Sequence, residues 1–168
     1  TMLDIIYNEK SGSGKGKRLR NKVDKILNEK GVEYKIHKTE HARHATQLAK
    51  EIYANQKEGD AIVVIGGDGS LNEAVQELPL EEKPVIGYIP TGSGMDFAHG
   101  HDIPLNTLDA LEKIINSKGT VEIDIGKAVY DGKERYFTVS AGIGYDAGVC
   151  YDLDHSKYKN FFNDLDQY

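Results

Sequence analysis

Short apolar runs alternate with longer amphipathic stretches between residues 3 and 115 of the chain. The runs are rich in Val, Ile and Tyr, which favour strands, and residues typical of turns lie at their ends. They predict strands at residues 3–8, 32–39, 60–66 and 84–90. Strands that alternate with helices in this way form a mostly parallel, doubly wound sheet, so the pattern predicts an α/β fold.

The stretches between these strands carry apolar residues at helical spacing, so that one face of each helix packs on the sheet. The first helix ends at Gly31, because glycine commonly follows the last helical residue. The second stops near Gly59, and Thr107 is expected to cap a third. The apolar positions of the three helices are Leu19, Val23, Ile26, Leu27, Ala45, Leu48, Ala49, Ile52, Tyr53, Leu108, Leu111, Ile114 and Ile115.

The pattern changes after Gly119. Residues 121–149 alternate apolar and polar positions on both sides of Asp131-Gly132, a dipeptide typical of a two-residue hairpin turn. We therefore expect one domain over residues 1–120 and the start of an antiparallel β-domain over residues 121–168. A few strands cannot bury both of their faces without a partner layer, so we expect the chain to be a fragment of a longer protein.

Composition and charge exclude several classes of protein. The formal net charge is −6, from 27 acids and 21 bases, which lacks the basic footprint of a nucleic-acid-binding protein. One cysteine permits no internal disulfide and suits a reducing cytoplasm. No apolar run is long enough to cross a membrane, and acids stand where a signal peptide needs its apolar core. We expect a cytoplasmic protein without nucleic acid as a partner.

The sequence GGDGS after the third expected strand contains the strongest candidate chemistry. Ligands of open α/β sheets bind beyond the carboxyl ends of the strands, where Gly66, Gly67 and Gly69 would let a phosphate approach the backbone. Asp68 would orient a magnesium ion or take a proton from an attacking hydroxyl. The alternative is a tight turn in which Asp68 caps the next helix. Two polar residues of the following turn, Asn72 and Glu73, favour the phosphate site.

Four motifs in this order and spacing resemble the diacylglycerol kinase catalytic-domain family of soluble bacterial lipid kinases. They are IIYNEKSGSGKGK, VVIGGDGSLNEAV, PTGSGMDFA and FTVSAGIGYDAGV. The glycine loop alone is shared with NAD kinases and, more distantly, phosphofructokinases. The resemblance implies a nucleotide-binding α/β domain over residues 1–120 and the beginning of a β-sandwich lipid-binding domain over 121–168, ATP and Mg²⁺ as cofactors, and a lipid alcohol as the acceptor.

The resemblance also implies roles for individual residues. Asp68 is the implied catalytic residue, as general base or magnesium organiser, and Asp146 would hold the acceptor head group. Met95 departs from the family, which usually has asparagine there, so we expect one polar contact to the nucleotide to be lost. The metal ligands are not assigned. The implied ATP-binding residues are Asn8, Ser11, Gly12, Thr39, Gly66, Gly67, Asp68, Gly69, Ser70, Asn72, Glu73, Gly92, Ser93 and Asp96.

Several alternatives stay open at this point. The acceptor is diacylglycerol, another neutral lipid alcohol or a sphingoid base. A nucleotide-binding regulatory protein without catalysis would fit Met95, and an NAD kinase would fit the glycine loop. The bases between Lys15 and Arg20 form either a solvated helix start or a basic lip that contacts nucleotide or the inner face of a membrane. A homodimer is a further expectation. The histidines are expected on the surface rather than on a metal.

Overall fold

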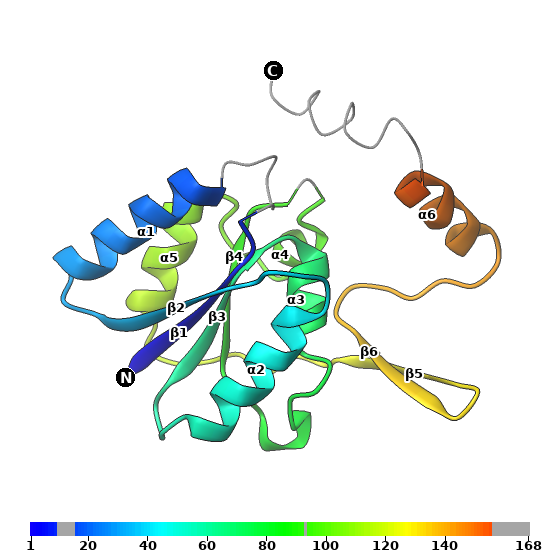
Figure 1. The fold of residues 1–168 in the computed structure, drawn as a ribbon, viewed down its shortest axis with the longest axis horizontal. Helices are drawn as coiled ribbons and strands as arrows, with labels where there is room; N and C mark the ends of the chain where they lie inside the picture. Colours follow the sequence, from blue (N-terminus) through cyan, green and yellow to red (C-terminus); the bar gives the residue numbers. More distant parts are fainter. Residues whose placement is uncertain (10–15, 93, 156–168) are drawn as a thin grey trace.

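A computed structural model describes residues 1–9, 16–92 and 94–155 of the chain. Its centre is a parallel four-stranded sheet in the order β2-β1-β3-β4 (Figure 1). The strands are β1 (Met2–Tyr7), β2 (Glu33–Lys38), β3 (Ala61–Gly66) and β4 (Ile86–Pro90). Each lies where the apolar runs predicted it, so the doubly wound α/β fold is confirmed.

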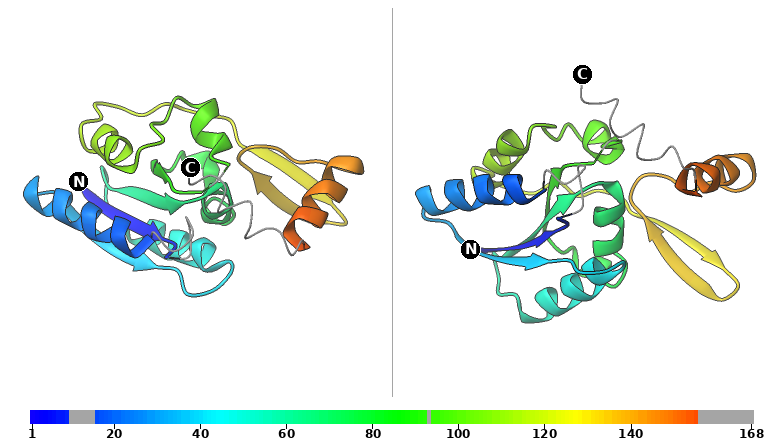
Figure 2. Two further views of the ribbon diagram at one scale, coloured as in Figure 1. Left: turned by 90° about the horizontal axis from the view of Figure 1, so that it is seen from above. Right: turned by 45° about the horizontal axis from the view of Figure 1, so that its top comes forward.

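Helices cover both faces of this sheet, α1 and α5 one face and α2 and α3 the other (Figure 2). They are α1 (Gly16–Glu29), α2 (His44–Asn55), α3 (Asp68–Ala74), α4 (Asp96–Gly100), α5 (Thr107–Ile115) and α6 (Tyr145–His155), with a 3-10 helix at Leu80–Glu82. Gly31 follows α1 at a φ of +63°, the left-handed conformation expected after a helix. The predicted cap of α5 is wrong by one residue, because Asn106 Oδ1 accepts the amides of Leu108 and Asp109.

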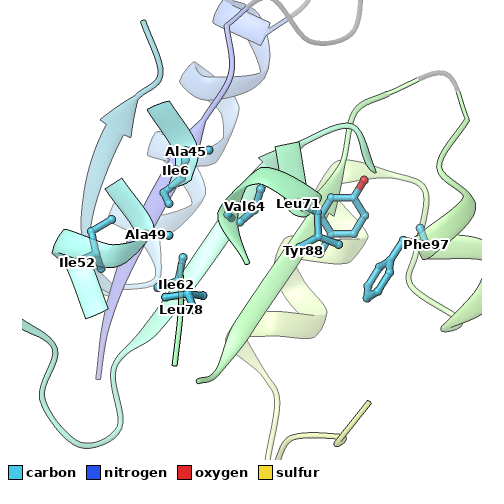
Figure 3. Packing of buried hydrophobic residues seen from close by; sticks show 12 residues of the cluster. Ile6, Ala45, Ala49, Ile52, Ile62, Val64, Leu71, Leu78, Tyr88 and Phe97 are labelled. Carbon is cyan, nitrogen blue, oxygen red and sulfur yellow. The ribbon is translucent and has the colours of Figure 1, made fainter. Parts of the chain in front are cut away.

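The two core clusters follow from the period of two along β1 and β3. Ile6 and Val64 point to the α2 and α3 face, where they lie among Leu71, Tyr88 and Phe97 (Figure 3). Their neighbours along the strands pack against α1 and α5 instead; these are Leu3, Ile5, Tyr7, Val63 and Ile65. Both faces of the central strands are therefore buried, and the glycine loop follows the carboxyl end of one of these strands, β3.

One histidine expected on the surface is largely buried instead. His37 Nε2 lies 2.7 Å from Asp4 Oδ1, and the side chains are only 15% and 7% exposed. Lys35 and Glu51 join this pair in the lining of a cavity of about 310 Å³ between α2 and the amino-terminal half of β1. The pattern of apolar residues in the sequence does not reveal this pair, because β2 is an edge strand in which exposed and partly buried positions mostly alternate.

The segment after Gly119 folds as a hairpin followed by a helix. Strands β5 (Gly126–Tyr130) and β6 (Lys133–Phe137) pair antiparallel, and Asp131 and Gly132 turn between them at φ values of 47° and 69°. These positive φ values confirm the two-residue turn. Helix α6 was not expected, since strands were predicted up to residue 149. Over the described residues, no helix is both long and apolar enough to cross a bilayer.

The hairpin and α6 lie apart from the sheet and its helices (Figures 1 and 2). Among the described residues, neither core cluster includes an apolar side chain beyond Ile115 or has one packed against it. Large apolar side chains in this segment stand in solvent, with Val121 88% and Ile143 98% exposed. The second unit therefore has no apolar core in the part of the chain that the structure describes.

Candidate active site

The carboxyl ends of all four parallel strands meet at one edge of the sheet. The chain runs outward from β1 to β2 on one side and from β3 to β4 on the other, so the strand order reverses between β1 and β3. Ligands of open α/β sheets bind at such a reversal, beyond the strand ends. Asn8 follows β1 here and Gly67 follows β3, and these two residues flank the candidate site.

Two of the predicted residues meet across the reversal, and a third lies at the end of the neighbouring strand β2. The side-chain nitrogen of Asn8, Nδ2, lies 3.5 Å from Ser70 Oγ, and the backbone N–H of Asn8 donates to Ile65 O at 3.2 Å. Thr39, at the end of β2, donates to Tyr7 O from its backbone at 2.9 Å and from its hydroxyl at 3.3 Å. The structure thus brings Asn8 and Ser70 together and places Thr39 beside Tyr7, the residue before Asn8.

The glycines of this edge allow close backbone approach. A Cβ on Gly66 would lie 2.6 Å from the Ser70 side chain, and one on Gly92 would lie 2.8 Å from Gly67 Cα. The loops after β3 and β4 therefore touch through their backbones, and any side chain at Gly92 would force them apart. Gly69 differs, because a Cβ there would meet nothing within 4 Å. Packing does not require glycine at position 69.

The Asp68 carboxylate is held by three donors. Oδ2 accepts the backbone amide of Asp96 at 2.9 Å, and Oδ1 accepts the amide of Phe97 and the hydroxyl of Tyr88, both at 3.3 Å. Asp68 thus satisfies the first amides of α4, whose own N-cap residue, Met95, makes no side-chain bond. The capping alternative is right in kind, but the capped helix is α4 rather than the helix that Asp68 itself begins.

A second carboxylate lies beside Asp68. A Cβ on Gly94 would lie 3.5 Å from Asp68 Oδ2 and 3.7 Å from Asp96 Oδ2, so both oxygens face the same glycine. Among the described residues, no group of three metal-ligating side chains gathers. Mg²⁺ is commonly bound by one or two carboxylates together with waters and substrate phosphates, so this pair is compatible with a magnesium site.

Tyr88 was not predicted as a site residue. It lies within an apolar strand and its ring packs edge-on against Phe97 at 5.6 Å between centroids (Figure 3). Burial raises the pKa of its hydroxyl, and the Asp68 carboxylate raises this pKa further. A tyrosine in a strand of otherwise aliphatic residues was the available signal, because a buried hydroxyl needs a hydrogen-bond partner.

Tyr88→Phe is expected to lower the free energy of unfolding at neutral pH by about 1–2 kcal/mol, since a bond to a charged group is lost. The pKa of Tyr88 is raised by folding from 10.0. Its contribution is therefore complete below the unfolded pKa and is lost as pH rises above it. Denaturant titrations at neutral and alkaline pH should show a smaller alkaline loss for Tyr88→Phe than for the wild type. Tyr130→Phe, on an exposed ring, is the control, and an equal effect would contradict the assignment.

Met95 packs its side chain against the apolar cluster of the α2 and α3 face, which contains Leu71, Tyr88 and Phe97. Its backbone has a φ of 52°, in the left-handed region that favours asparagine over most other residues. A left-handed backbone of this kind would by itself favour asparagine at this position. The loss of a polar contact to nucleotide at this position stays a prediction.

The remaining predicted residues are placed less directly. Asn72 Oδ1 accepts the amide of Thr138 at 3.2 Å, which turns its side chain toward the hairpin, and the Glu73 carbonyl accepts the Thr46 hydroxyl at 2.8 Å. Asp146 belongs to α6. Three further residues of the predicted nucleotide site lie outside the described residues: Ser11, Gly12 and Ser93.

Known proteins match nearly the whole chain. The sequence profile of the diacylglycerol kinase catalytic domain matches residues 2–128. A diacylglycerol kinase of Bacillus subtilis (strain 168) is 37% identical over 166 residues, 98% of this chain and 52% of that protein. One of Staphylococcus carnosus (strain TM300) is 36% identical over 158 residues, 94% of this chain and 49% of that protein.

Solved structures match as well. A crystal structure of a diacylglycerol kinase from Bacillus anthracis (strain Sterne) superposes with a TM-score of 0.66 at 29% identity, over 80% of this chain and 47% of that one. The chain therefore spans about half the length of the relatives that it matches.

Proposed function

Because the chain belongs to the diacylglycerol kinase catalytic-domain family, we propose that the protein containing it transfers the γ-phosphate of ATP to the hydroxyl of a diacylglycerol-like lipid. The observation that carries this proposal is the Asp68 carboxylate, fixed by three donors beside the paired glycine loops at the strand reversal. Phosphoryl transfer depends mainly on positioning and charge stabilisation, and a rigid acid among approachable backbone groups supplies both.

The nucleotide phosphates would lie along the loop from Gly67 to Ser70. The open space above Gly69 leaves room for them, and Asn8 and Ser70 add polar groups from both sides of the reversal. Thr39 and Gly92 border the same edge. The three residues outside the described ranges, together with Glu73 and Asn72, stay predictions of the sequence.

Mg²⁺ would be held by Asp68 and Asp96, whose oxygens face Gly94 together. The ion would neutralise charge on the transferred phosphate. Three donors already use most of the roughly four lone-pair positions of the Asp68 carboxylate. About one position is left, which either a metal ion or a proton could take, and we assign Asp68 the organising role because its three donors hold the carboxylate in a fixed orientation beside Asp96.

The acceptor lipid would meet the second unit, which begins after residue 120. The exposed apolar side chains of this unit favour burial by a further β-layer of the whole protein, with Asp146 near the acceptor. A lipid acceptor implies a cytoplasmic protein that contacts a membrane surface peripherally. The homodimer expected from the sequence stays a prediction.

The proposal is tested with the full-length protein, ATP labelled at the γ-phosphate, and three acceptors: diacylglycerol in mixed micelles, a sphingoid base, and NAD. Label in phosphatidic acid is the expected result. Label in NAD with none in any lipid would replace the proposal with a nucleotide kinase. Nucleotide binding without transfer to any acceptor would favour a regulatory protein.

A further inference from the structure

Polar contacts, rather than an apolar core, join the hairpin to the α/β domain. Of the side chains described between residues 131 and 152, only Tyr136, Phe137 and Thr138 are shielded from solvent. These three residues lie at the end of β6 and just after it. The same short segment is hydrogen-bonded to α3 and to the turn that follows it.

We call the hydrogen bonds that link Gln76 and Asn72 to Tyr136 and Thr138 the joint, and Gln76 makes two of these three bonds. Its Oε1 accepts the Tyr136 amide at 3.1 Å, and its Nε2 donates to the Tyr136 carbonyl at 2.8 Å. The side chain therefore pairs with one backbone residue as a neighbouring strand would. Nε2 also donates to Asn72 O at 2.7 Å, which fixes the amide against the helix. Asn72 Oδ1 adds a bond to the Thr138 amide at 3.2 Å.

The same helix reaches the candidate nucleotide loop. Helix α3 begins at Asp68, and Gln76 comes two residues after its last residue, Ala74. The residues that bond the hairpin, Asn72 and Gln76, thus follow the phosphate loop, Gly67–Ser70, within the same short helix and the turn after it. The outer contact between Lys83 and Glu122 is an exposed ion pair, which holds position weakly.

We propose that Gln76 is a positioning residue that sets the distance between the nucleotide loop and the acceptor-binding unit. This inference rests on the proposed function. Residues 138–144 lead from the joint to α6, which carries Asp146. A change at Gln76 therefore moves the acceptor unit relative to Asp68 without replacing any side chain of the Gly67–Ser70 loop. Misplacement of about 1 Å is sufficient to lower turnover about 100-fold.

The test uses Gln76→Met, which keeps the length of the side chain but loses its hydrogen bonds, and Gln76→Glu, which keeps the acceptor for the Tyr136 amide and loses the donor. Asn55→Ala is the control, because Asn55 bonds only within α2 among the described residues. All are made in the full-length protein. Hydrogen exchange at the Tyr136 amide should be faster in Gln76→Met, intermediate in Gln76→Glu and unchanged in Asn55→Ala.

Kinetics then separate positioning from a merely structural effect. We expect kcat for lipid phosphorylation to fall about 10- to 100-fold in Gln76→Met and also in Gln76→Glu, whose second carboxylate oxygen would face the carbonyls of Asn72 and Tyr136. ATP affinity and melting temperature should stay near wild type in both variants. Wild-type kcat in Gln76→Met overturns the inference, and so does a loss of ATP affinity equal to the loss of kcat. If the wild type phosphorylates no lipid, the proposed function fails, and unchanged exchange at Tyr136 would show separately that the joint is wrong.

Discussion

Asp68→Asn in the full-length protein is expected to lower phosphoryl transfer by about 10²- to 10⁴-fold, the range for loss of a positioned acid or of fixed charge stabilisation. The amide is neutral, so it cannot attract Mg²⁺ as the carboxylate does. Initial rates of label transfer from ATP to lipid at saturating substrate measure the effect.

This substitution also has a structural cost, which must be measured beside the rate. The asparagine NH₂ must face either the Asp96 amide or the Phe97 amide and the Tyr88 hydroxyl, all of which are donors. One side of the cap of α4 is therefore lost, at about 1–3 kcal/mol.

Asp109→Asn removes the same charge from an exposed position in the first turn of α5, so it should leave the rate unchanged and cost at most about 1 kcal/mol of stability through the helix dipole. A folded Asp68→Asn variant with near wild-type turnover would overturn the assignment of Asp68.

Gly92→Ala and Gly69→Ala are expected to distinguish a glycine needed for packing of the two loops from a glycine needed for close approach of a ligand. A Cβ at position 92 would lie 2.8 Å from Gly67 Cα, so the loops must move apart. We expect Gly92→Ala to lose about 1–3 kcal/mol in unfolding free energy and most of its ATP binding. A Cβ at position 69 meets no protein atom within 4 Å. Gly69→Ala should therefore keep full stability.

The decisive quantity is ATP affinity in Gly69→Ala. If phosphate lies against this backbone, the methyl group occupies its place, and ATP affinity should fall about tenfold or more while the melting temperature holds. Calorimetric titration with ATP and Mg²⁺ measures it. Wild-type affinity in Gly69→Ala would mean that the phosphates lie elsewhere.

The sheet could be predicted from the sequence because its central strands, β1 and β3, are buried on both faces. Such strands are near-continuous apolar runs, and β3, from Ala61 to Gly66, is a clear example. The placement of the glycine loop and of Asn8, Thr39 and Ser70 at the carboxyl ends of the strands followed from strand order and from the resemblance to the family. That family is confirmed by the match over residues 2–128.

The partners of Asp68 could not be predicted. Helix α4 has five residues, too short for a periodic pattern, and its amides come 28 and 29 residues after Asp68 in the chain. The left-handed backbone of Met95 could not be predicted either, because it leaves no trace in hydropathy. The pairing of Gln76 with Tyr136 was equally hidden, since a polar residue after a helix is typical of a solvated turn.

Helix α6 was missed for a different reason. The apolar and polar residues between 138 and 149 alternate like a strand, and the glycines at 142 and 144 made a helix start less evident. Most of the helix side chains that the structure describes are exposed, so tertiary burial gave no pattern to detect.

The central claim is that nucleotide phosphates bind at the reversal between β1 and β3. A crystal structure of the full-length protein with a non-hydrolysable ATP analogue and Mg²⁺ tests it most directly. The account predicts the triphosphate against the backbone of Gly67–Ser70, with the ion between the nucleotide and the carboxylates of Asp68 and Asp96. A nucleotide bound elsewhere, such as in the cavity beside Asp4 and His37, would contradict it.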